Sequence, residues 1–121
     1  MTLKAPISLF KGDDFNMEIT YSSLVNDVET TVNLTGYTIT FDILESKISG
    51  EEKLFSLTNG NGLELSNINN GVIGVHIPRS ISAELLNGIS YVYELAITSP
   101  TSAEYPNGLR TTILKEKINV K

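Results

Sequence analysis

The stretch that decides the fold is residues 80–98, which read SISAELLNGISYVYELAIT. Its first part predicts a short helix near residues 80–87, because Ser80 can act as an N-cap. Three apolar side chains then share one helical face: Ile81, Leu85 and Leu86. Asn87 and Gly88 are the residue types best suited to a left-handed backbone, so we expect the helical turn to end there.

From residue 89 onwards the apolar period changes to two, which is typical of a β-strand. One face of this strand is apolar and aromatic: Tyr91, Tyr93, Leu95 and Ile97. The other face is smaller or more polar: Val92, Glu94, Ala96 and Thr98. Because side chains alternate across a strand, we predict that the first set points into a core.

Short apolar runs between turn residues recur along the rest of the chain. Residues 7–10 predict an edge strand, which a turn-rich cluster at residues 11–14 closes. Alternating runs predict strands at residues 15–22 and 37–43, whereas the polar stretch 26–33 is either a short edge strand or a loop. Further strands are expected at residues 53–57, 63–66, 72–77 and 109–120, with turns at 50–52, 59–62 and 69–71 and a loop at 99–108.

Short strands at this spacing, with one helical turn, predict an all-β fold. The expected architecture is an antiparallel immunoglobulin-like β-sandwich of about seven to nine strands. With 121 residues the chain is expected to form a single domain over residues 1–121. A domain of this size buries roughly 65% of its unfolded surface, so one core suffices without disulfides.

Charge and composition exclude several classes of function. The formal net charge of −5 would repel a nucleic-acid backbone and an anionic membrane surface, so neither is expected as a partner. The absence of cysteine excludes a disulfide scaffold and thiol nucleophiles. No apolar run approaches the roughly 18 residues of a membrane span, and residues 1–6 show no signal-peptide stretch.

Few residues invite a chemical interpretation. His76 is the only histidine, and it lies in an alternating run where Val75 and Ile77 face the other way, so a surface or interface position is expected. Asp13 and Asp14 are expected to be turn residues, because the spaced oxygen ligands and central glycine of a calcium loop are missing. The sequence therefore predicts no metal site and no cofactor.

The remaining candidates also have structural explanations. The glycines of residues 59–62 are expected to form a turn, because no lysine and no helix follow to hold a phosphate. Glu51 and Glu52 are expected to be a solvated pair. Most of the 5 tyrosines fall on predicted inward faces: Tyr21, Tyr37, Tyr91 and Tyr93. Only Tyr105 is a candidate for an exposed contact. We find no nucleophile, base and orienter set, so the chain is not expected to be an enzyme.

Four short motifs stand in order along the chain: GDDF at residues 12–15, LTGY at 34–37, SISAELL at 80–86 and GISYVYEL at 88–95. Together they resemble the small β-sandwich domains of tailed-bacteriophage virion proteins. Baseplate upper proteins and tail-fibre attachment domains are the members most similar. The resemblance spans residues 7–120 and rests on structural motifs.

The resemblance implies structural rather than catalytic roles for the matched residues. Gly36 lets the chain turn sharply into its strand, and the helical turn covers one open end of the sandwich with Leu85 and Leu86. The positions that carry the likeness are Gly36, Tyr37, Gly88, Tyr91, Tyr93 and Leu95. No catalytic, cofactor-binding or metal-binding residue is implied.

The implied function is assembly of a virus particle. Such domains dock on other virion subunits, often as trimers, so we expect a homo-oligomer that is made in the host cytoplasm and located in the virion. Tail, baseplate, collar and capsid accessory positions all remain open. The chain stops at Lys121, directly after its last predicted strand, which favours a decoration, collar or tail-accessory subunit. The alternative is a carbohydrate- or cell-surface-binding module that uses Tyr105 and residues 99–108.

Overall fold

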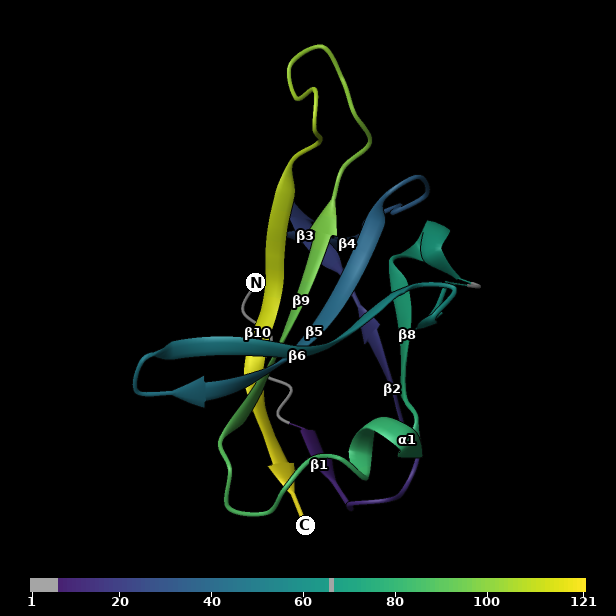
Figure 1. The fold of residues 1–121 in the computed structure, drawn as a ribbon. Helices are drawn as coiled ribbons and strands as arrows, with labels where there is room; N and C mark the ends of the chain where they lie inside the picture. Colours follow the sequence, from purple (N-terminus) through teal and green to yellow (C-terminus); the bar gives the residue numbers. More distant parts are fainter. Residues whose placement is uncertain (1–6, 66) are drawn as a thin grey trace.

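The computed structural model describes residues 7–65 and 67–121, most of which form β-strands (Figure 1). The strands are β1 (Ile7–Leu9), β2 (Phe15–Thr20), β3 (Ser22–Val25), β4 (Val28–Thr31), β5 (Thr38–Lys47), β6 (Gly50–Asn59), β7 (Gly62–Glu64), β8 (Val72–Ile77), β9 (Tyr91–Thr98) and β10 (Arg110–Val120). The helical elements are a 3-10 turn, η1 (Ile68–Asn70), and a short α-helix, α1 (Arg79–Ser82). The predicted all-β class is confirmed.

Eight strands form one mixed sheet in the order β1-β10-β9-β5-β6-β7-β8-β2, and β3 and β4 form a separate hairpin. The sheet curls until it is nearly barrel-shaped, with β10, β9 and β5 on one side and β8 and β2 on the other (Figure 1). Its two terminal strands, β1 and β2, each have one edge that pairs with no other strand of the described chain.

The structure does not confirm the predicted two-sheet, antiparallel immunoglobulin-like sandwich. It contains two parallel pairs, β1 with β10 and β6 with β7, within one continuous sheet. The first pair joins the two ends of the described chain, with Ile7 opposite Ile118, and no local sequence signal reports such a contact. The turn prediction favoured antiparallel neighbours because short connections usually produce them.

The core lies inside the curled sheet. All four inward side chains predicted for β9 are buried: Tyr91, Tyr93, Leu95 and Ile97. The neighbouring strand β5 contributes three side chains that are also fully buried: Ile39, Phe41 and Ile43. The rings of Phe41 and Tyr93 stack with centroids 5.0 Å apart and planes inclined by 17°. Fully burying a side chain of this kind stabilises a fold by roughly 1.5–3 kcal/mol.

The first strands follow the predicted pattern closely. β1 lies at one edge of the sheet, as expected for residues 7–10. In β2 the inward side chains are half-buried or buried, and the outward ones, Asn16, Glu18 and Thr20, are exposed. The ambiguous stretch 26–33 contains β4, whose residues are all exposed, and Asn26 and Asp27 form its tight turn with φ of 51° and 64°.

The hairpin between β5 and β6 turns earlier than predicted. The expected tip at residues 50–52 is wrong, because Lys47 already pairs with Gly50 and the turn consists of residues 48 and 49. Gly50 therefore begins β6 instead of forming the turn, and Ile48 is fully exposed at the tip. Because Ile48 is apolar and β-branched it provides no turn signal, so the sequence predicted the turn at Gly50 instead.

The helix is shorter than the expected residues 80–87, and its N-cap is not Ser80. α1 begins at Arg79 after Pro78, and neither Pro78 nor its neighbours supply a side-chain cap. Instead Asp14, 65 positions earlier, accepts a hydrogen bond from the Arg79 N–H at 2.9 Å. The capping carboxylate is thus supplied by the tertiary fold, which a local capping rule cannot predict.

Hydrogen bonds fix the segment around α1 on the turn that precedes β2. The fully buried Ser82 hydroxyl donates to the Asp13 carbonyl at 2.7 Å and accepts from the Gly12 N–H at 3.2 Å. Leu85 is fully buried, as predicted, but Leu86 is 52% exposed, so its expected covering role is wrong. Its backbone N–H donates to the Tyr91 hydroxyl at 3.0 Å, which ties the segment after α1 to the start of β9.

Gly71 and Gly88 both have a positive φ, and only Gly71 lacks space for a Cβ, so substitutions at the two positions distinguish backbone strain from steric overlap. Gly88 has φ +82° and open space where a Cβ would lie, whereas at Gly71, φ +73°, a Cβ would lie 2.5 Å from the Tyr21 carbonyl oxygen and 2.8 Å from that of Val32. Gly88→Ala should cost about 1–2 kcal/mol of unfolding free energy through φ alone. Gly71→Ala should cost clearly more, and equal losses in urea unfolding would contradict the described turn at Gly71.

Candidate functional site

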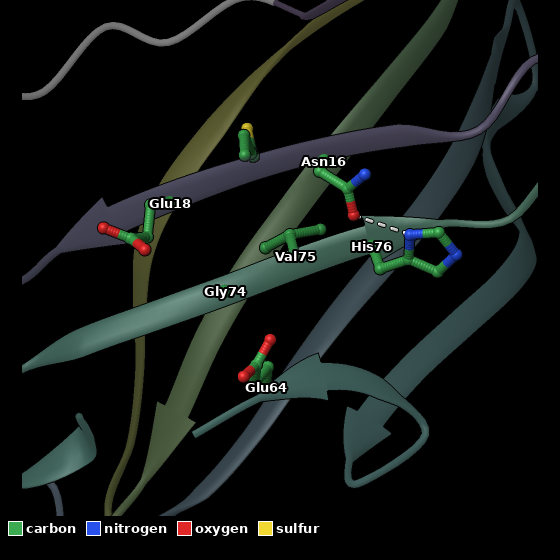
Figure 2. Close-up of a pocket in the computed structure, with 7 residues that line it drawn as sticks. Asn16, Glu18, Glu64, Gly74, Val75 and His76 are labelled. Carbon is green, nitrogen blue, oxygen red and sulfur yellow. Dashed lines mark hydrogen bonds between the residues drawn. The ribbon is translucent and has the colours of Figure 1, made fainter. Parts of the chain in front are cut away.

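A shallow depression of about 370 Å³ lies on the outer face of β2, β8 and β7 (Figure 2). Its polar lining consists of Asn16, Glu18, Glu64 and His76. Gly74 of β8 forms its floor, because it leaves the space between the neighbouring side chains open. Glycine within a strand commonly marks such a close approach to the backbone.

The register of three strands produces this arrangement. On β8, Ile73, Val75 and Ile77 are buried, so Gly74 and His76 face outward. Glu18 of β2 and Glu64 of β7 are both opposite Gly74, one on each side. The two carboxylates therefore flank the glycine on one exposed surface, as Figure 2 shows.

His76 lies at one end of the depression, on the exposed surface predicted for it. Its Nδ1 is 2.6 Å from the Asn16 side-chain oxygen, which lies opposite in the β2–β8 register. Its Nε2 is 3.7 Å from a carboxylate oxygen of Asp14. The imidazole is thus oriented by Asn16 of β2 and by Asp14 of the preceding turn rather than by the two glutamates.

The chemistry of the depression is that of an acidic contact surface. Within residues 7–65 and 67–121, Glu18 and Glu64 form no ion pair or side-chain hydrogen bond. The same residues contain no cluster of three His, Asp or Glu side chains that could hold a metal ion. Exposed carboxylates without partners attract a positively charged side chain.

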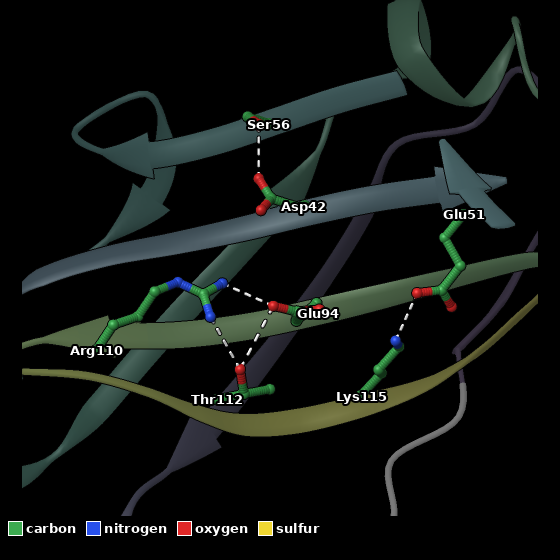
Figure 3. A network of polar contacts seen from close by, with 7 residues as sticks. All are labelled: Asp42, Glu51, Ser56, Glu94, Arg110, Thr112 and Lys115. Atoms are coloured by element: carbon green, nitrogen blue, oxygen red, sulfur yellow. Dashed lines mark hydrogen bonds and ion pairs between the residues drawn. The ribbon is translucent and has the colours of Figure 1, made fainter. Parts of the chain in front are cut away.

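The outer face on the opposite side of the sheet is occupied by paired side chains (Figure 3). Glu94 accepts from the Arg110 guanidinium at 2.6 Å and from the Thr112 hydroxyl at 3.4 Å. The hydrogen bond from Arg110 holds the pKa of Glu94 below its ordinary value. Ser56 donates to Asp42 at 2.5 Å on the neighbouring strands. These polar groups already have partners within the chain.

Ion pairs also fix the long β5–β6 hairpin. Lys115 of β10 lies 2.6 Å from Glu51, and its hydrogen bond to that carboxylate raises the pKa of Lys115. Lys47 pairs with Glu52 and with Glu45, and the hydrogen bond to Glu52 is the main cause of its raised pKa. Because these pairs are exposed to solvent, which screens their charges, they contribute little to the stability of the fold.

A second depression, of about 510 Å³, lies where the segment before β9 meets the end of β10. Gly88 and Ile89 line one side, and Lys117 and Asn119 line the other. The predicted positive φ of Gly88 is confirmed, but the strand begins at Tyr91 and not at residue 89. This depression brings together no set of titratable groups that suggests a reaction.

The residues singled out by the resemblance do not converge on a surface. Tyr91, Tyr93 and Leu95 are buried side by side along β9, and burial raises the pKa of Tyr93 to about 12. Gly36 has φ +86°, as a sharp entry to β5 requires. Tyr37 is half-buried, and its carbonyl accepts a hydrogen bond from the Asn59 side chain at 3.1 Å. The geometry therefore gives these residues structural positions in the fold.

Tyr105 is 40% exposed, in agreement with its predicted position on a loop. The loop is held by its own hydrogen bonds: the Tyr105 N–H donates to the Ser102 hydroxyl at 3.0 Å, and the Tyr105 carbonyl accepts from the N–H groups of Ser102 and Gly108, each at 2.9 Å. Neither depression described above includes Tyr105. Its ring therefore stands apart from the acidic surface.

The acidic depression was not predicted from the sequence. Glu64 lies 46 positions after Glu18, and only the register of β8 brings the two together. The available signal was Gly74, a glycine inside a predicted strand. It indicated a close approach without identifying what approaches.

Comparisons with known proteins do not assign a family. No protein-family model matches the chain, and no curated protein was found to be similar to it. In the described part of the chain, no helix is long and apolar enough to cross a membrane. The functional proposal therefore rests on the residues and their geometry.

The Glu94–Arg110 pair predicts a pH-dependent stability difference. The folded-state pKa of Glu94 is lowered, so its contribution is present above the ordinary pKa of 4.5 and lost as pH falls through the folded-state value. Glu94→Gln should lower the unfolding free energy at pH 7 by up to about 1 kcal/mol, and the difference should shrink in acid. Glu64→Gln is the control without an ion pair. Denaturant titrations in which the Glu94→Gln deficit grows in acid would contradict the assignment.

Proposed function

We propose that the chain is a non-enzymatic structural protein of a tailed-bacteriophage particle, which acts in assembly through protein–protein contacts. The proposal combines the motif resemblance at residues 12–15, 34–37, 80–86 and 88–95 with the character of the surface. The observation that carries it is the exposure of apolar side chains on two hairpins: Leu24, Val28 and Ile48. These positions suit contacts with neighbouring subunits.

The β3–β4 hairpin is the clearer of the two. It forms its own two-stranded sheet, and Leu24 and Val28 are each 63% exposed. Ser22 donates a hydrogen bond of 2.6 Å to Glu29, which links the strands at the base. The register places Leu24 and Val28 on opposite faces of the hairpin, because Leu24 pairs with Glu29 and Val28 with Val25. A two-stranded hairpin is marginally stable by itself, so a neighbour that covers either face would stabilise it.

The β5–β6 hairpin extends beyond the rest of the sheet (Figure 1). Its tip presents Ile48, which is fully exposed, and ion pairs of Lys47 and Glu51 lie directly beside this tip. Single exposed apolar residues are common on protein surfaces. Ile48 differs from them in its position at the tip of an extended hairpin, where a side chain reaches a neighbour first.

We also propose that the curled sheet is a variant of the immunoglobulin-like sandwich that the resemblance implies. In support, side chains from its two sides pack into one cluster, with Phe41 and Tyr93 from one side and Ile73 and Val75 from the other. The parallel pairs at β1–β10 and β6–β7 then distinguish this chain from a purely antiparallel sandwich.

The proposal includes the location and the partners. The protein is made in the host cytoplasm and incorporated into the virion, where it contacts other virion proteins and further copies of itself, for example as a trimer. The exposed apolar residues are few, so modest contacts repeated by symmetry are expected rather than one large apolar interface. Tail, baseplate, collar and capsid accessory positions fit equally.

Mass spectrometry of purified particles tests this function. We expect the protein in virions at a stoichiometry that matches a symmetric ring or multiple copies per particle. Its presence in infected cells but absence from virions would overturn the proposal. Leu24→Asn combined with Val28→Asn should reduce incorporation, whereas Thr30→Asn, at an exposed polar position of the same hairpin, is the matched control.

Carbohydrate binding is the second candidate, supported by the exposed ring of Tyr105 on a hydrogen-bonded loop. An aromatic ring in this setting can stack on a sugar. A glycan array with the parent protein and Tyr105→Ala tests it, with Glu104→Ala as the control at an adjacent exposed position. Binding that is lost only in Tyr105→Ala would favour this function, and no binding by the parent would exclude it for the glycans tested.

A further inference from the structure

β2 is a sheet edge whose outer side pairs with no other strand among residues 7–65 and 67–121. It contains 6 residues, lies at the end of the sheet order and pairs with β8 without a register shift. Natural proteins usually protect such an edge with proline, lysine, a bulge or a covering segment. The sequence of β2, FNMEIT, contains neither proline nor lysine. By comparison β1, at the other edge, has only 3 residues.

The hydrogen-bonding groups that face outward from this edge can be identified. The Tyr21 N–H, directly after β2, donates to the Gly71 carbonyl on the β8 side at 2.9 Å. Backbone groups point to alternate sides along a strand, so Ile19, Met17 and Phe15 also point towards β8. The N–H and C=O groups of Asn16, Glu18 and Thr20 therefore face the free edge.

The two faces beside this edge differ in character. On the inner face, Phe15 and Met17 are only half-buried, whereas Ile19 is buried. A strand added to β2 would cover the first two with its own apolar side chains. On the outer face, Glu18 presents its carboxylate on the edge strand itself, and Glu64 presents a second one on β7, beyond β8; neither has an ion-pair partner among the described residues.

The charge of the outer face determines which strand fits. A strand with lysine or arginine on its outward face would place a positive charge beside Glu18, and the carboxylate of Glu64, on the far side of Gly74, adds to the negative charge of the same face. Pairing of two β2 edges with Glu18 opposite Glu18 would instead place like charges together. The net charge of −5 on the chain also favours a basic partner.

We propose that the free edge of β2 accepts an extended strand from another protein, apolar on its inward face and basic on its outward face. This inference rests on the proposed assembly function and gives it a mode of contact, β-strand addition. The backbone groups of Asn16, Glu18 and Thr20 bind the main chain of the added strand. Glu18 pairs with its basic side chains, and Glu64 adds to the negative charge that attracts them.

Hydrogen exchange measured by NMR tests the proposal with a synthetic probe. The probe is a capped peptide of about seven alternating lysine and valine residues, the length of an ordinary strand. Saturating peptide should slow exchange of the Asn16, Glu18 and Thr20 amides about tenfold or more, because they become hydrogen-bonded. The amides of Met17 and Ile19 bond to β8 already and should change little.

Two variants test the contact at Glu18: the first removes its backbone N–H together with its carboxylate, and the second reverses the charge alone. Glu18→Pro removes an N–H that faces the free edge, so the fold should persist while the protection of Asn16 and Thr20 is lost. Glu18→Lys keeps that N–H and should shift the preference towards a matching glutamate–valine peptide. Thermal melting of each variant checks that it is folded. If Glu18→Pro does not fold, the charge reversal still decides the question.

Several results would overturn the inference. One is unchanged exchange at Asn16, Glu18 and Thr20 with saturating lysine–valine peptide, and another is equal protection by the glutamate–valine peptide. Failure here with the protein present in purified virions would leave the assembly function standing with another mode of contact. Strand addition by a protein that is absent from virions would refute only the particle assignment.

Discussion

The rest of the sheet depends on the contact between β5 and β9. The rings of Phe41 and Tyr93 stack on each other at this contact. These two strands are the centre of the core, and their register places Phe41 diagonal to Tyr93 on the inward face. The strands on either side, β10 and β6, are held by pairing with this centre. The twist of a sheet accumulates from strand to strand, so the curvature and the unpaired edges depend on the strands outside this central pair.

The elements furthest from this centre carry the surfaces that we assign to assembly. The β3–β4 hairpin lies outside the main sheet, and β2 lies at its last position beside the acidic depression. The opposite outer face is filled by internal pairs such as Glu94 with Arg110, which leaves it little capacity for new polar contacts. Polar side chains that are already paired within the chain therefore cover one side of the molecule, and the carboxylates of the acidic depression lie on the other side.

The sequence predicted those features that depend on local period. The inward faces of β2, β5 and β9 followed from alternation, and the positive φ of Gly88 followed from its place after a helical turn. The parallel pairing of β1 with β10 and the capping of α1 by Asp14 could not be predicted, because each joins segments distant in sequence. The acidic depression was hidden for the same reason, since register alone places Glu18 and Glu64 around Gly74.

Native-state hydrogen exchange across the whole chain tests most directly whether β5 and β9 form the centre of stability. Amides in β5 and β9 should exchange last and only through global unfolding, whereas those of the β3–β4 hairpin should exchange early by local opening. The Tyr93→Leu variant should accelerate exchange in β5, β9 and β10 together, because they open as one unit. Equal protection of the β3–β4 hairpin and β5, or independent opening of β5 and β9, would contradict this account.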